Sequence, residues 1–330
     1  MAVNDFWTLE RTNRRQTAML VVVFLALFCA LGLGLDFVIG TLRFRDGALS
    51  GFPVVTLIAL AIGSIQAVVS YYAGAALILG SVHAKRLLPD TDKHQMVIDV
   101  IQEMTLAARM PPIKAYVMAD PAPNAFATGR DPRHSYICVT QGLIDQMDRE
   151  EMQGVLGHEM AHIRNYDIRT MMMIAVMVGG VALLADFVYY GGVGNDHDDE
   201  GGGSLLMVAV FILAVLAPIL SQLLAMAVSR QREYLADASS VEFTRNPRAL
   251  GRALEHLATI EAPVKNASMG TAHLFIINPL ESVKKEDNEG WLANLLSTHP
   301  PLRRRIERLR AMAGAAAAPA PAAATSGSKA

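Results

Sequence analysis

The chain alternates long apolar runs with polar, mixed stretches. Four of the apolar runs are long enough to cross a hydrocarbon core, which takes about 20 helical residues. They lie at residues 18–40, 54–79, 171–190 and 204–228. Each run predicts a transmembrane helix, because helices buried in a large soluble core are seldom apolar over such lengths.

Basic residues flank these runs unevenly. Arg11, Arg14 and Arg15 precede the first run, whereas the loop between the third and fourth runs is acidic and contains no Lys or Arg. Two arginines in the loop between the first and second runs do not fit this uneven distribution of basic residues. Because cytoplasmic flanks are richer in Lys and Arg, we expect both termini and residues 80–170 to lie in the cytoplasm.

The polar part of the chain combines helical and extended segments. Apolar residues recur at helical spacing over residues 92–109. Three short β-prone runs follow, at residues 113–118, 124–129 and 135–140. Asp148 and Glu151 have the spacing of a capping box at the start of a further helix. The expected fold is therefore an α-helical membrane protein that carries an α+β domain with a small β-sheet.

The amino-acid composition of the chain excludes several classes of protein function. Of the 330 residues, 52% are hydrophobic and 18% are charged, against about a quarter charged in an ordinary soluble domain. The formal net charge of -2 offers no general attraction to nucleic acid. Two cysteines cannot build a disulfide framework or a Cys-type zinc finger. We therefore expect the lipid bilayer as a partner and no nucleic acid.

The clearest chemical pattern is His158-Glu159-Met-Ala-His162 on an expected helix. A spacing of four places both imidazoles on one helix face, where they can bind one zinc ion. Glu159 is turned about 100° from His158, so it can reach a water on the metal rather than the metal itself. Zinc lowers the pKa of such a water to about 7, and a carboxylate can take its proton. The alternative is a chance match on an ordinary amphipathic helix.

A catalytic zinc site usually has three protein ligands and one open position. Glu233 and Asp237 lie four residues apart on a later expected helix. One carboxylate can bind the metal while the other orients a ligating imidazole. Taken alone, such a pair usually marks a solvated helix face.

Several segments, taken in order, resemble the HtpX-type membrane zinc metalloproteases. More distant relatives of that type are the CAAX prenyl endoproteases and the mitochondrial inner-membrane stress protease. The segments are GVLGHEMAHIRNYDIRT, SRQREYLADASS and STHPPLRRRI. The resemblance implies a zincin-like metalloprotease domain with one Zn²⁺ per chain on His158, His162 and Glu233. It also implies that Glu159 is the general base and that Asp237 supports a ligand.

Two further segments match this family. Asn124-Ala125-Phe126 resembles the edge strand that aligns the substrate backbone through main-chain hydrogen bonds; a purely structural strand is the alternative. His299 and Arg305 resemble a late histidine–arginine pair, which implies donors to the oxyanion of a tetrahedral intermediate. Alternatively, the arginines around Arg305 form a basic face against anionic lipid.

The expected function is a membrane-integrated zinc metalloendopeptidase, active at the cytoplasmic face of a bacterial inner membrane. Its partners would be protein substrates, chiefly membrane proteins and misfolded ones. The roles in protein quality control and the stress response, like the bacterial source, come from the resemblance alone. Natural substrates, cleavage sites and oligomeric state stay open.

Three other functions are alternatives to a membrane zinc endopeptidase. An intramembrane zinc protease would need its motif inside a span and an aspartate ligand in another, for which Asp36 and Asp186 are the candidates. A prenyl-protein protease would need more than four spans for its chamber. A catalytically idle scaffold or chaperone would lack Glu159 or Glu233, and both are present.

The order of these features predicts five parts of the chain. An N-terminal arm and two membrane helices come first, and the metalloprotease domain is divided by a membrane hairpin. A disordered Ala/Pro-rich tail closes the chain. The expected boundaries are 1–80, 81–170, 171–228, 229–312 and 313–330.

Overall fold

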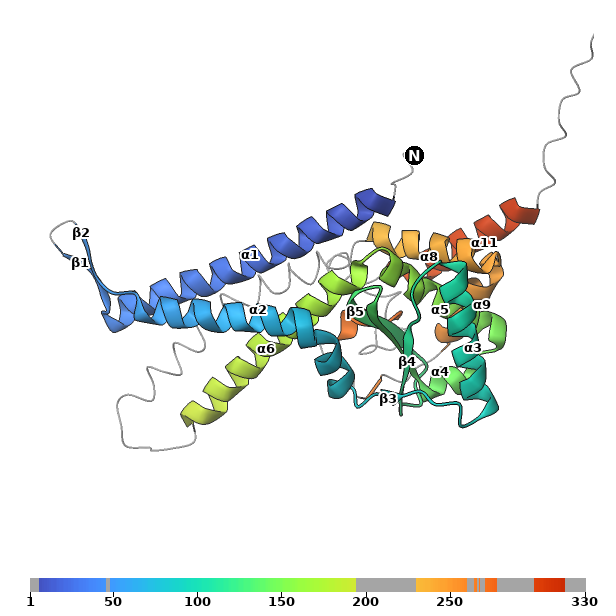
Figure 1. Cartoon of the computed structure of the whole chain (residues 1–330), viewed down its shortest axis with the longest axis horizontal. Helices are drawn as coiled ribbons and strands as arrows, with labels where there is room; N and C mark the ends of the chain where they lie inside the picture. Colours follow the sequence, from blue (N-terminus) through green and yellow to red (C-terminus); the bar gives the residue numbers. More distant parts are fainter. Residues whose placement is uncertain are drawn as a thin grey trace, which may run out of the picture.

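Three long helices extend from one side of a body that holds the main β-sheet in the computed structural model (Figure 1). They are α1 (Phe6–Ile39), α2 (Val54–Ser81) and α6 (Asp167–Val193). A hairpin of β1 (Leu42–Arg45) and β2 (Ala48–Gly51) joins α1 to α2 at the end away from the body. The structure describes residues 6–45, 48–193, 230–259, 264–265, 267, 271–277 and 300–317.

Two of these helices are long and apolar enough to cross a membrane. The candidate spans are Arg11–Phe37 within α1 and Val54–Ser81, which is α2. Large apolar side chains such as Ile58, Ile65 and Val68 are exposed on α2, as expected of a surface that faces lipid. The third expected span lies in α6, and the fourth, at 204–228, lies outside the described residues. Four spans are therefore not confirmed, and two candidates are found in the described part.

An aspartate inside α1 holds the start of α2. The buried Asp36 carboxylate accepts hydrogen bonds from the backbone N–H groups of Val55 (3.0 Å) and Thr56 (2.9 Å). The first N–H groups of a helix have no partner within the helix, so a carboxylate here both bonds them and complements the helix dipole. Asp36 thus has a structural task at the hairpin end of α1, away from the body.

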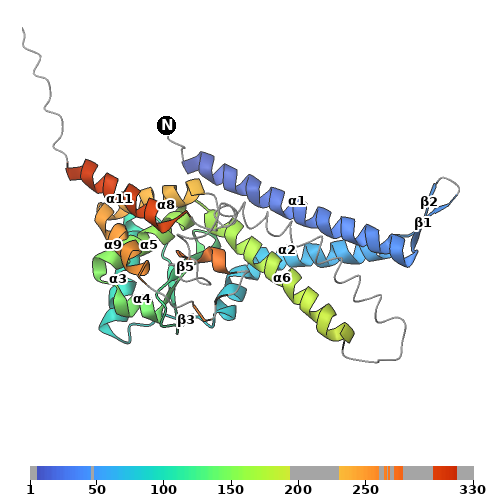
Figure 2. The same cartoon turned by 180° about the vertical axis from the view of Figure 1, so that it is seen from behind.

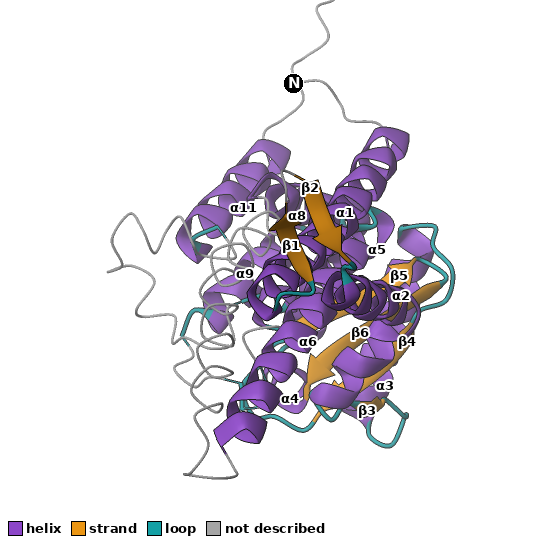
Figure 3. Ribbon diagram, turned by 90° about the vertical axis from the view of Figure 1, so that its left-hand side faces the viewer, coloured by secondary structure: helices purple, strands orange, loops and turns teal. Residues whose placement is uncertain are grey.

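The body is built on a mixed four-stranded sheet with strand order β3-β4-β6-β5. Its strands are β3 (Lys85–Arg86), β4 (Lys114–Met118), β5 (Ala125–Asp131) and β6 (His134–Thr140). Strand β4 pairs with β6 in parallel, and β5 pairs with β6 as an antiparallel hairpin. The three β-prone runs are therefore strands, and β5 lies at the sheet edge. In Figure 3 this sheet and the β1–β2 hairpin are separate from each other.

In the described part of the chain, seven short helical segments surround the sheet; α8 and α9 lie beside α5, and α11 packs against α9 (Figure 2). They are α3 (Asp92–Ala107), α4 (Gln141–Gln146), α5 (Arg149–Arg164), α8 (Arg230–Thr244), α9 (Pro247–Leu257), α11 (Leu302–Ala317) and the 3₁₀ turn η1 (Ala272–Leu274). The predicted capping box of Asp148 and Glu151 is present at the start of α5.

The sheet is covered on both faces, and its side chains divide between two apolar cores. Ala127, Ile137 and Val139 face a core built with α5, α8 and α9. Phe126 and Cys138 face a second core formed with α1, α2 and α6. Because successive strand residues point to opposite faces, the sheet joins the long helices on one side to α5 on the other.

Candidate metal centre

Helices α5 and α8 bring to one point three side chains that could hold a metal ion. His158 and His162 lie one turn apart on α5, and Glu233 lies in the first turn of α8. All three side chains are buried, and their ligand atoms lie within 4.8 Å of one another. The structure thus joins two parts of the chain that are about seventy residues apart.

Small residues allow α8 and α9 to approach α5 this closely. A Cβ atom at Gly157 would lie 2.9 Å from Ser240 Oγ, and one at Gly154 would lie 2.4 Å from the Leu250 backbone nitrogen. Ser240 Oγ also donates a hydrogen bond to the Gly154 carbonyl at 2.8 Å. A larger residue at either glycine would push away the helix that carries Glu233 or its neighbour α9.

The candidate ligand atoms have the spacing that zinc requires, with a different Glu233 oxygen near each histidine. The distance is 3.2 Å between His158 Nε2 and His162 Nε2, 3.6 Å between His158 Nε2 and Glu233 Oε2, and 3.5 Å between His162 Nε2 and Glu233 Oε1. Ligand atoms of a tetrahedral zinc ion, with bonds of about 2.0–2.2 Å, lie about 3.4 Å apart. The residues present therefore fit a three-ligand zinc site.

Asp237 orients the first histidine from behind. Its Oδ1 atom lies 3.0 Å from His158 Nδ1, which leaves Nε2 to face the other ligands. Burial and the nearby Arg305 guanidinium lower the pKa of His158 to about 4, so the ring is neutral, as a metal ligand must be. Although burial opposes it, Arg305 lowers the pKa of Asp237 to about 2.

Asp167 orients the second histidine, a role that the sequence pattern did not predict. Asp167 Oδ2 lies 3.1 Å from His162 Nδ1. The Asp167 Oδ1 atom accepts a hydrogen bond from Asn13 Nδ2 of α1 at 2.8 Å, and the same nitrogen donates to the Asn165 carbonyl. Although burial opposes it, the bond to Asp167 and the charge of Glu233 raise the pKa of His162 to about 9.

The position of Asp167, five residues after His162, was a signal that could have identified it. Metal-bound histidines usually donate their other ring N–H to a carboxylate or carbonyl, so an acid just beyond the helix end was a natural candidate. Asn13 had no such signal, because it is 154 residues from Asp167 in the sequence.

Glu159 lies beside the three ligands and is 1% exposed. Its carboxylate accepts a hydrogen bond from the backbone N–H of Ala127 on β5. Burial raises the pKa of Glu159 from its ordinary 4.5 to about 7, and the negative charge of Glu233 acts in the same direction. A carboxyl group with a pKa near 7 can exchange a proton at neutral pH, as a general base must.

The predicted substrate edge is already paired with a segment of the chain itself. Phe126 forms an antiparallel bridge with Phe275, and the Ile276 N–H donates to the Ala125 carbonyl at 3.0 Å. Asn124 Nδ2 donates to the Ile277 carbonyl at 3.1 Å. The edge of β5 nearest Glu159 therefore holds residues 275–277 in the antiparallel sense.

Arg305 of α11 is buried, and its guanidinium forms hydrogen bonds with neighbouring groups. Nη2 and Nε donate to the two Asp237 oxygens at 2.7 and 3.0 Å, and Nη1 donates to the Ile276 carbonyl at 3.2 Å. Arg305 thus holds both Asp237 and the segment on the substrate edge. Its role as an oxyanion donor stays a prediction, and His299, its expected partner, lies outside the described residues.

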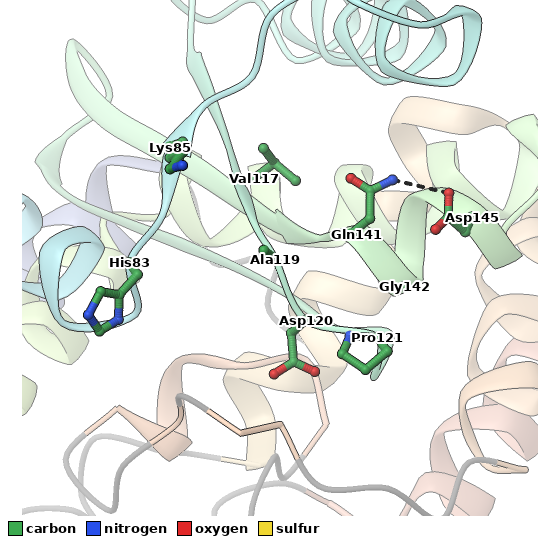
Figure 4. A pocket seen from close by; sticks show the side chains of 9 residues that line it. All are labelled: His83, Lys85, Val117, Ala119, Asp120, Pro121, Gln141, Gly142 and Asp145. Carbon is green, nitrogen blue, oxygen red and sulfur yellow. Dashed lines mark hydrogen bonds between the residues drawn. The ribbon is translucent and has the colours of Figure 1, made fainter.

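A separate cavity of about 330 Å³ lies at one end of the sheet and is shown in Figure 4. Its lining includes His83, Lys85, Asp120 and Asp145, and the Gln141 side chain donates to Asp145 at 3.1 Å. None of the predicted site residues lines this cavity, so it is distinct from the metal centre.

Comparison with known proteins gives a family match over most of the polar region. The model described as "Peptidase family M48" matches residues 89–313. A "Protease HtpX homolog" of Lactobacillus helveticus is 37% identical over 309 residues, which cover 91% of this chain and 97% of that protein. One of Dictyoglomus turgidum is 43% identical over 228 residues, 68% of this chain and 71% of that protein.

Among solved structures, the crystal structure of S. mikatae Ste24p is similar over 91% of this chain and 66% of that one. The identity is 16% and the TM-score is 0.45. A likeness of this degree adds no argument about fold or activity.

Proposed function

This chain belongs to peptidase family M48 and is an HtpX-type membrane metalloprotease; from that premise we propose that it is a zinc-dependent endopeptidase that cleaves membrane proteins. The site lies at the cytoplasmic face of a bacterial inner membrane, and the activity serves protein quality control under stress. The named relatives come from bacteria, which supports a bacterial source.

The observation that carries this proposal is the cluster of His158, His162 and Glu233 with Glu159 beside it. Three buried ligand atoms at zinc spacing, together with a carboxyl group of raised pKa, form the minimum set for peptide hydrolysis by activated water. An idle scaffold would have no need to keep all four groups buried together, since burying ionisable groups is costly.

In the proposed mechanism each residue has a defined task. When bound, zinc supplies a Lewis acid and lowers the pKa of water to about 7. Glu159 takes a proton from the attacking water and passes it to the leaving amine nitrogen. Asp237 and Asp167 hold the Nδ1 atoms of the two histidines, so that each Nε2 atom stays available for the metal.

The position of the centre supports membrane proteins as substrates. Helix α6 begins at Asp167, which touches His162, and α1 reaches the same place through Asn13. The centre thus lies next to α1, which holds a candidate membrane span, and to α6, which holds the third expected span. We propose that residues 81–170 and 229–312 form one protease domain around it, on either side of the hairpin 171–228.

Proteolysis by the purified full-length chain tests this function. The detergent-purified protein, supplied with zinc, is incubated with an unfolded test protein, and the Glu159→Gln variant is run beside it. We expect one zinc ion per chain in both proteins, cleavage by the first and a loss of at least about 10²-fold in the second, because only the base is removed. Absence of bound zinc, or equal cleavage by the variant, would overturn the proposal.

A further inference from the structure

A large basic cleft lies where the long helices meet the body. Its volume is about 1150 Å³, and its lining comes from α1, α2, the α5–α6 turn, the β5–β6 turn and the ends of α3 and α8. Six arginines line it: Arg14, Arg109, Arg133, Arg164, Arg169 and Arg245. The acids in the lining are Asp131 and Glu242, so positive charge is in clear excess.

The acids are already engaged, whereas several arginines are not. Asp131 bonds His134 at 2.9 Å, and Glu242 lies 3.6 Å from Arg164. Arg109, Arg133 and Arg245 are exposed, and within the described part of the chain none of these three makes an ion pair. The cleft therefore presents guanidinium groups whose charge is not neutralised by the described residues.

Three residues in the left-handed backbone conformation lie at the same cleft. Among the described residues, the non-glycine positions with positive φ are His83, Arg109, Tyr166 and Arg245, at 53–62°. The last three line the cleft. This conformation favours glycine and costs other residues roughly 1 kcal/mol or more. Each of the three directly follows the end of a helix (α3, α5 or α8), where a left-handed residue commonly closes the last turn, so three helix ends meet at the cleft.

Residues typical of the boundary between bilayer and water surround the cleft. Arg14 is near the start of the candidate span Arg11–Phe37, and the Arg130 guanidinium lies over Tyr71 and Tyr72 of α2, at 6.0 and 5.4 Å. Arg169 lies over Tyr166 at 5.1 Å. Tyrosine and arginine concentrate at the boundary between bilayer and water, where a ring can be buried while a polar end stays hydrated.

We propose that this cleft binds the headgroup phosphate of an anionic phospholipid. Guanidinium groups suit phosphate because they donate two parallel hydrogen bonds to its oxygens. A cleft at headgroup level meets lipids at high local concentration, whereas free phosphate must come from solution. This inference goes beyond peptide hydrolysis and does not depend on it.

Binding of short-chain lipids to the detergent-purified full-length protein tests the proposal. Dihexanoyl phosphatidylglycerol, dihexanoyl phosphatidylcholine and inorganic phosphate are titrated separately, each lipid below its micelle concentration, by microscale thermophoresis. We expect phosphatidylglycerol to bind at least about tenfold more tightly than either of the others, and its affinity to fall as salt rises. Equal affinities for the two lipids would overturn the proposal, and so would phosphate binding as tight as that of phosphatidylglycerol.

Matched variants locate the site. In the cleft variant, Arg109, Arg133 and Arg245 are each changed to Gln, and in the control variant Arg86, Arg248 and Arg304, which are exposed elsewhere, are changed likewise. We expect the cleft variant to lose at least about tenfold in phosphatidylglycerol affinity and the control to stay within twofold. Equal losses of phosphatidylglycerol affinity in the two variants would show that net charge alone attracts the lipid. Such a result would overturn the proposal that the lipid binds in the cleft. Arg133→Glu alone, at an exposed turn, repeats the test with one substitution.

Discussion

Each histidine of the candidate metal centre presents its Nε2 atom to the other candidate ligands, because its Nδ1 atom is bonded to a carboxylate. Asp237 serves His158 and Asp167 serves His162. The two carboxylates are themselves held, Asp237 by Arg305 and Asp167 by Asn13. Since a ring that can rotate binds metal less well, these outer contacts set the affinity of the centre.

Asn13→Leu is expected to weaken zinc binding even though Asn13 is in α1. The change removes the hydrogen bond to Asp167 Oδ1, so the carboxylate can turn away from His162. We expect the zinc dissociation constant, measured by competition with a chelator, to rise about tenfold. Thr17→Val is the matched control, because Thr17 bonds Thr170 across the same helix interface without touching Asp167. Equal effects of the two changes would contradict a positioning role for Asn13.

Glu159 makes the stability of the metal-free protein depend on pH. Its pKa is raised from 4.5 to about 7, so the folded state binds more protons than the unfolded state between these values. Stability is therefore lost as the pH rises through this window, by about 3 kcal/mol at most above pH 7. We expect Glu159→Gln to raise the thermal midpoint by several degrees at pH 8 and very little at pH 5.

The exposed Glu150 on the same helix provides the control for this effect. Glu150→Gln should leave the difference in thermal midpoint between pH 5 and pH 8 the same as in the unchanged protein. If Glu159→Gln gave the same shift at both pH values, the effect would come from packing rather than from ionisation.

At the scale of elements, the edge strand β5 has two competing uses. It is the predicted site for an extended substrate, and residues 275–277 already occupy it in the antiparallel sense. An edge strand offers one row of free N–H and C=O groups. A substrate that pairs with Ala125 must therefore displace the Ile276 N–H.

Ile276→Pro is expected to make this edge more accessible. Proline has no N–H, so the bond to the Ala125 carbonyl is lost. A hydrogen bond of this kind is worth about 1 kcal/mol, so kcat/KM for an extended peptide should rise about fivefold. Ile276→Ala removes the side chain but keeps the N–H and serves as the control. A fall in kcat/KM with proline alone would mean that residues 275–277 support the active site rather than block it.

At the scale of the whole molecule, the arrangement couples a membrane part to a catalytic part. The sheet lies between α5, which carries the histidines, and the long helices, and Asn13 connects α1 to the metal centre. The proposed orientation places the body and the basic cleft at the cytoplasmic face, with the β1–β2 hairpin on the opposite side of the bilayer.

Cysteine labelling in intact bacteria tests that orientation. Cys29 and Cys138 are replaced by alanine, and a single cysteine is placed at exposed Ser50 in β2 or at exposed Lys114 in β4. An impermeant maleimide should label the Ser50→Cys protein in whole cells, and the Lys114→Cys protein only after lysis. The reverse pattern would place the body outside the cytoplasm.

The local features of this protein could be predicted from short stretches of sequence. Apolar runs indicate the two candidate spans, and short β-prone runs indicate β4, β5 and β6. The spacing of His158 and His162 depends only on helix geometry. Such features are local, because hydrogen bonding and side-chain periodicity within one element decide them.

What the sequence alone determined was therefore the elements, the chemical types at the site and the family resemblance. Only the tertiary structure decided which distant groups meet: Asn13 with Asp167, Arg305 with Asp237, and Ile276 with the edge of β5. It also gathered arginines from five separate segments into one cleft. Packing of helices and strands that are far apart in the chain sets these contacts, and no local pattern carries that information.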